Sequence, residues 1–174
     1  MNETHPNSEE MNALMALAGL QRQVKSGASN YYWIAALSVI NSLGALFDAG
    51  INFVIGLGFT QLVDGIAWGI AESIPDSATL IRALGIITSV GISILFVVFG
   101  YFAIKGHRWA FIVGMILYAL DGFLLLAFQD WFGFGFHLFL LWGLFSGLKA
   151  LKKLENFLPK NPADSAFPTD IEIN

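Results

Sequence analysis

The sequence has no cysteine and few charged residues, and each absence excludes a class of function. Without cysteine, the 174 residues cannot form a disulfide bridge, a thiolate metal site or a cysteine nucleophile. Charged residues make up 13% of the chain, about half of the quarter that is usual in soluble domains. The nine Lys and Arg residues are scattered, and the net charge is −4. Because nucleic-acid binding requires concentrated positive charge, we expect no nucleic-acid partner.

Apolar side chains are the residues that the chain has in excess. They amount to 56% of all residues, including 16 Phe, and the mean hydropathy is +0.65. A soluble chain of this size buries only about 70% of the surface that it exposes when unfolded. That is too little to hide so many apolar groups, so we expect an integral membrane protein whose main partner is the lipid bilayer.

Four apolar stretches are long enough to be candidate membrane-spanning helices, because the hydrocarbon core is about 30 Å thick. They cover residues 31–48, 80–104, 109–128 and 131–150. Tyr31, Tyr32, Trp33, Trp109 and Trp131 stand at their ends, and membrane interfaces favour aromatic side chains. The predicted fold class is therefore an all-α, four-helix transmembrane bundle over residues 30–150.

The segments that flank this bundle are polar. In residues 1–29, Ser8 is expected to cap an amphipathic helix and Gly27 to end it. The apolar stripe of this helix predicts that it lies on the membrane surface, with a partly frayed lead-in as the alternative. Residues 151–174 are expected to continue the last helix briefly and then form a largely disordered, proline-containing tail.

Residues 49–79 raise the question of a fifth span. Gly56 and Gly58 interrupt this apolar segment, Asp64 lies in its middle, and Lys and Arg favour the cytoplasmic side of a membrane. Four spans with both termini inside place eight Lys and Arg in the cytoplasm and only Arg82 outside, whereas the better five-span arrangement gives six and three. We therefore predict four spans in a cytoplasmic (inner) membrane, with cytoplasmic termini. Residues 49–79 then form an outer segment whose short helix, from Thr60 to Ser73, is interfacial or re-entrant.

Four polar residues are expected at a similar depth inside the bundle. Asp121 and His137 lie on either side of a turn centred between Gln129 and Asp130, which places them within about 1.5 Å of one level. Asn41 and Ser89 lie at a corresponding distance from the outer ends of their own spans. An Asp within a span costs roughly 2.5–3.5 kcal/mol on insertion scales, so Asp121 requires a partner.

This polar layer has two interpretations. It is either a hydrogen-bond cluster that joins the helices, which we favour, or an outward-facing site for a proton, a cation or a small polar ligand. In the second interpretation, Gln61 and Asp64 of the outer segment form a lid. For Asp64 alone, simple exposure to water on a short outer helix is the favoured expectation.

The sequence carries no catalytic motif that we recognise. Only His137 lies within a span, whereas a haem with two axial histidines needs two and a zinc site needs three or four ligands. Ser146 lies in GLFSG, which is not the G-x-S-x-G turn of hydrolases. We therefore expect a non-enzymatic protein without a cofactor or metal. Its expected role is structural or interaction-based, with protein partners or a second copy, and transport or sensing is the rival.

Overall fold

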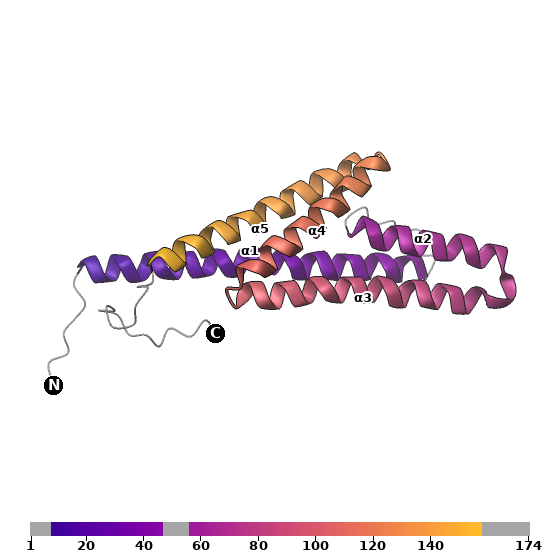
Figure 1. The fold of residues 1–174 in the computed structure, drawn as a ribbon, viewed down its shortest axis with the longest axis horizontal. Coiled ribbons are helices and arrows are strands. Elements are labelled where there is room, and N and C mark those ends of the chain that lie inside the picture. Colours follow the sequence, from indigo (N-terminus) through magenta and orange to yellow (C-terminus); the bar gives the residue numbers. More distant parts are fainter. Residues whose placement is uncertain (1–7, 47–55, 158–174) are drawn as a thin grey trace, which may run out of the picture.

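The computed structural model describes residues 8–46 and 56–157, and all regular structure in these residues is helical (Figure 1). A 3₁₀ turn at Pro75–Ser77 joins the second helix to the third. The helices are α1 (Ser8–Leu46), α2 (Gly58–Ser73), α3 (Ala78–Ile104), α4 (Arg108–Ala127) and α5 (Trp131–Phe157).

Three of the described helices are long and apolar enough to cross a membrane, which indicates a membrane-embedded protein. They are α3 with its preceding turn, α4 and α5. Their bounds lie close to those predicted from the apolar stretches, and α5 continues to Phe157 as expected. Because α1 is not among these three, the four-span count stays a prediction.

The first helix differs from the expectation of two separate elements. Helix α1 is one continuous helix of 39 residues, about 58 Å long, and Gly27 does not end it. A Cβ atom built on Gly27 would lie 2.5 Å from the Cα of Gly147 in α5. This glycine therefore serves a close approach of two helices rather than a helix end.

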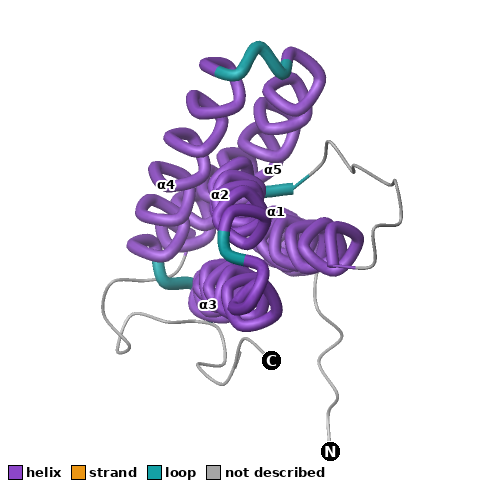
Figure 2. The backbone as a smooth tube through the Cα atoms, turned by 90° about the vertical axis from the view of Figure 1, so that its right-hand side faces the viewer, coloured by secondary structure: helices purple, strands orange, loops and turns teal. Residues whose placement is uncertain are grey.

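The helices form an elongated bundle. Helix α1 packs along α3 and α5, and α2 packs along α3. The α2–α3 hairpin extends along the long axis past the end of α1, whereas the α4–α5 hairpin leans away from that axis (Figures 1 and 2). A wedge between α3 and α4 results, and the start of α2 lies near it.

An aromatic cluster joins α1, α3 and α4. The buried ring of Tyr31 lies 6.1–6.3 Å, centroid to centroid, from the rings of Phe96, Phe99 and Phe111. Its hydroxyl donates to the carbonyl oxygen of Phe111 at 2.8 Å. Many other aromatic side chains, such as Phe139 and Trp142 of α5, are exposed. The excess of aromatics therefore fills the core and also covers the surface that faces lipid.

Candidate functional site: a buried carboxylate at the start of α2

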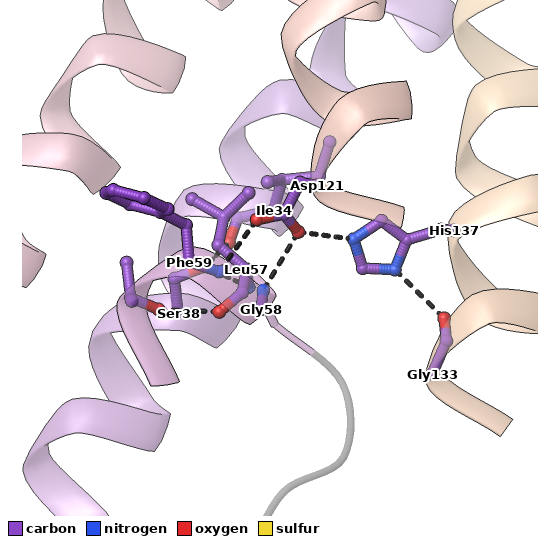
Figure 3. Close-up of polar contacts among 9 residues, drawn as sticks. Ile34, Ser38, Leu57, Gly58, Phe59, Asp121, Gly133 and His137 are labelled. Atoms are coloured by element: carbon purple, nitrogen blue, oxygen red, sulfur yellow. Dashed lines mark hydrogen bonds and ion pairs between the residues drawn. The ribbon is translucent and has the colours of Figure 1, made fainter. Parts of the chain in front are cut away.

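Asp121 and His137 are in direct contact inside the molecule. The Asp121 Oδ2 atom lies 2.8 Å from His137 Nε2, and both side chains are buried (Figure 3). The α4–α5 turn brings them together: Gln129 adopts a left-handed φ of 61°, and Asp130 accepts the amide of Gly133 at 2.9 Å at the start of α5. The equal depth predicted from the hairpin is therefore accompanied by a hydrogen bond.

The same carboxylate also holds the start of α2. The amides of Gly58 and Phe59 donate to Asp121 Oδ2 and Oδ1, each at 2.8 Å (Figure 3). The first amides of a helix have no partner within that helix, and a carboxylate suits its positive N-terminal end. Asp121 therefore caps α2 from a different helix. We call Asp121, His137 and these two amides the Asp121 cluster.

The backbone just before these amides is held by α1. The amide of Leu57 donates to Ser38 Oγ at 2.9 Å, and Gly56, Leu57 and Gly58 are all buried. A Cβ atom on Gly58 would lie 2.6 Å from Leu125 Cδ2, so glycine allows α2 to begin this close to α4. Helix α2 begins at Gly58 and not at Thr60 as predicted, and the Thr60 hydroxyl donates to the Leu57 carbonyl at 2.8 Å.

His137 is held on both sides of its ring. Its Nδ1 atom lies 2.9 Å from the carbonyl oxygen of Gly133, one turn earlier in α5. Its ring stacks on Tyr118 with a centroid distance of 4.2 Å and an angle of 16°. With 1% of its surface exposed, the imidazole has a fixed orientation.

The two ring nitrogens of His137 contact groups on different helices. Nδ1 lies against the Gly133 carbonyl of α5, which can only accept a hydrogen bond, and Nε2 lies against the carboxyl group of Asp121 in α4. His137 therefore links α4 to α5 at the level of the Asp121 cluster.

A second buried carboxylate joins α1, α2 and α3. Asp64 accepts the hydroxyl of Ser42 at 2.6 Å and that of Ser89 at 2.8 Å. We call these three residues the Asp64 cluster. The expectation that water surrounds Asp64 is wrong, since only 6% of its surface is exposed. The reason is that Thr60, Asp64, Ala67 and Ala71 form the buried face of α2.

The predicted polar layer is therefore divided between two clusters. Ser89 contacts Asp64 rather than Asp121 or His137, and Asn41 lies beside Gly56, just before α2. The Nε2 atom of Gln61 is buried and has no hydrogen-bond partner among the described residues. Asp64 is not a lid, because it lies between helices.

Sequence reasoning missed two serines and the backbone amides. Ser38 and Ser42 are one turn apart, so their spacing already placed both on one face of α1. The role of the Gly58 and Phe59 amides had no sequence signal, since it depends on where α4 lies.

The described residues hold no group of three or more His, Asp or Glu side chains that could bind a metal ion. Comparison with protein-family models, with curated proteins and with solved structures gives no match to this chain. Its function is therefore inferred from the two clusters and from the surface around them.

Proposed function

We propose that this chain is a non-enzymatic structural or interaction protein of the cytoplasmic membrane, in which the Asp121 cluster holds α2 in place. The observation that carries this proposal is that protein groups contact both oxygens of Asp121: they accept two amides of α2 and contact His137. A site for a soluble ligand would leave its polar groups available. Here groups from α2 and α5 engage a side chain of α4, as in a cluster that joins helices.

The proposed topology has four spans, with α1 as the first and α2 as a re-entrant helix. Leu57 bonds to Ser38, eight residues before α1 ends, which supports a start of α2 within the bundle rather than at its surface. Non-helical backbone at membrane depth needs protein around it, and the buried Gly56 and Leu57 meet that condition.

The distribution of charge supports cytoplasmic termini. Basic residues gather at the end of the bundle where α3 and α5 finish and α4 begins, while Arg82 lies near the opposite end. The basic residues at that end are Lys105, Arg108, Lys149, Lys152 and Lys153. Single cysteines introduced at Ser77 and at His107 of this cysteine-free chain should label from opposite sides of the membrane. Labelling of both from one side would contradict the topology.

A double-mutant cycle on Asp121 and His137 tests the structural role. Asp121→Asn and His137→Gln should each lower the stability of the detergent-solubilised protein, and the double variant should lose less than the sum, since the residues are in contact. Interhelical hydrogen bonds in membranes are worth about 0.6 kcal/mol on average, so the coupling should be of that order. Unchanged stability with an altered proton or cation flux in vesicles would favour transport instead.

Transport or sensing is the second candidate function, and the contact between Asp121 and His137 favours it. Ionisable side chains buried inside a membrane bundle are typical of proton and ion pathways, and both of these side chains are buried. A change at this pair would act directly on the start of α2, because Asp121 also holds the amides of Gly58 and Phe59.

Proton and cation flux into vesicles that contain the purified protein tests this second function. Flux through the wild-type protein that is lost in His137→Gln would support transport. Absence of flux, or equal flux in both proteins, would exclude it.

A further inference from the structure

A lateral groove of about 440 Å³ lies between the start of α2 and the middle parts of α3 and α4. Its volume is within the range of about 300–1,000 Å³ that is usual for ligand sites. Its lining residues come from three places: Leu57, which precedes α2, and Phe59 of α2; Ile92, Leu95 and Phe96 of α3; and Leu117, Leu120, Asp121 and Leu124 of α4.

The groove opens toward the surroundings of the membrane helices. Leu95, Leu120 and Phe59 line it and are exposed, Leu120 with 59% of its surface. Two of its walls, α3 and α4, are long and apolar enough to span the membrane. The medium next to the opening is therefore hydrocarbon, so the chains of bilayer lipids have direct access to it.

The chemistry of the lining selects an occupant without polar groups. Among the described residues, Asp121 is the only polar side chain in the lining, and both of its oxygens already contact protein groups, namely two amides and His137. The groove therefore offers an occupant almost no polar group to bind. A buried hydroxyl or amine would lose its hydrogen bonds to water without replacement, which is unfavourable, whereas a methylene chain loses nothing.

We propose that this groove binds one acyl chain of a bilayer phospholipid. The bound chain lies against Leu57 and Phe59, the residues on either side of Gly58, and so contacts the backbone that Asp121 caps. Binding of the acyl chain is independent of whether the Asp121 cluster has a structural role or a role in transport or sensing. An acyl chain in this position supports the start of α2 from the side opposite to the protein core.

Photo-crosslinking in vesicles of phosphatidylcholine, a fraction of which carries a diazirine on one acyl chain, tests the proposal on the full-length protein. The yield of adducts at Leu95, Leu117 and Leu120 should exceed the yield at Ile87. Ile87 is an exposed residue of α3 that lies outside the groove. Equal labelling at all these positions would mean ordinary lipid contact only. Weaker labelling in the groove would mean that a protein segment or a second copy covers it. Either result overturns the proposal.

A matched pair of variants on α4 separates groove filling from general disturbance. Leu117→Trp adds bulk to the groove and should remove the excess adducts at Leu95 and Leu120. Ile116→Trp makes a similar change on the adjacent exposed residue, which does not line the groove, and should preserve them. If Leu117→Trp does not fold, Leu95→Trp provides the same test from α3. Retention of the excess in a folded, groove-filled variant would contradict the proposal.

Discussion

The two buried carboxylates in the described part of the chain are held by different kinds of donor. Asp121 accepts backbone amides of Gly58 and Phe59, which can only donate. Asp64 accepts the hydroxyls of Ser42 and Ser89, which rotate and can either donate or accept. Asp121 therefore has to offer acceptors in fixed directions, whereas the Asp64 cluster can rearrange.

This difference assigns separate tasks to the same residue type. Asp121 satisfies a helix start that would otherwise be buried without partners, and a helix end buried in that way is costly. Asp64 bridges α1, α2 and α3 along their sides, where each helix already satisfies its own backbone. We expect loss of Asp121 to disturb the position of α2, and loss of Asp64 to loosen the packing of the helices only.

The largest expected effect is that of Asp121→Ala. It leaves two amides and one imidazole nitrogen without their partner, and unsatisfied buried groups cost about 1–3 kcal/mol each. We expect a loss of at least about 3 kcal/mol in the free energy of unfolding, measured by denaturant titration in detergent. Asp64→Ala serves as the control and should cost less. Equal costs would remove the distinction between the two clusters.

Replacement of each carboxylate by its amide sharpens the comparison. In Asp121→Asn, one α2 amide faces an NH₂ group in either orientation of the side chain, so we expect a loss of about 1–3 kcal/mol. In Asp64→Asn, the amide can donate to one serine, and Ser89 has the Thr60 carbonyl at 3.3 Å as another acceptor. That loss should stay near the interhelical average of about 0.6 kcal/mol. The reverse order of the two losses would contradict this account.

Two serines of α1 provide a matched test with the same substitution. Ser38→Ala removes the acceptor of the Leu57 amide and should cost about 1–2 kcal/mol. Ser42→Ala, one turn later, removes a hydroxyl donor from Asp64 and should cost only about 0.6 kcal/mol. Thermal unfolding of the two variants, measured side by side, shows which substitution costs more stability. A larger loss for Ser42→Ala would show that the hydroxyl bridge matters more than the helix start.

The elements that the sequence predicted well are those that local features determine. Helices α3, α4 and α5 follow from continuous apolar stretches, and the contact between Asp121 and His137 follows from a short turn that sets the register of its hairpin. Within such a hairpin, equal distance from the turn means equal depth, so the prediction needed no further information.

The features that the sequence did not predict depend on helices that are distant along the chain. Gly27 continues α1 because Gly147 of α5 meets it, and Asp64 is buried because one face of α2 packs on α3. Asn41 and Ser89 were predicted to share a layer with Asp121 and His137, but rotation of each helix about its axis decides which partner a side chain meets. Side-chain spacing along one helix does not determine that rotation relative to another helix.

Hydrogen exchange at the first amides of α2 tests most directly the central claim that Asp121 holds the start of this helix. Exchange at Gly58 and Phe59 should be slow in the wild-type protein and in Asp64→Asn, and at least one of these two amides should exchange much faster in Asp121→Asn. The backbone amides of the aromatic cluster around Tyr31 should remain protected from exchange in all three proteins, which would show that the fold persists. Unchanged protection of Gly58 and Phe59 in Asp121→Asn would contradict the account.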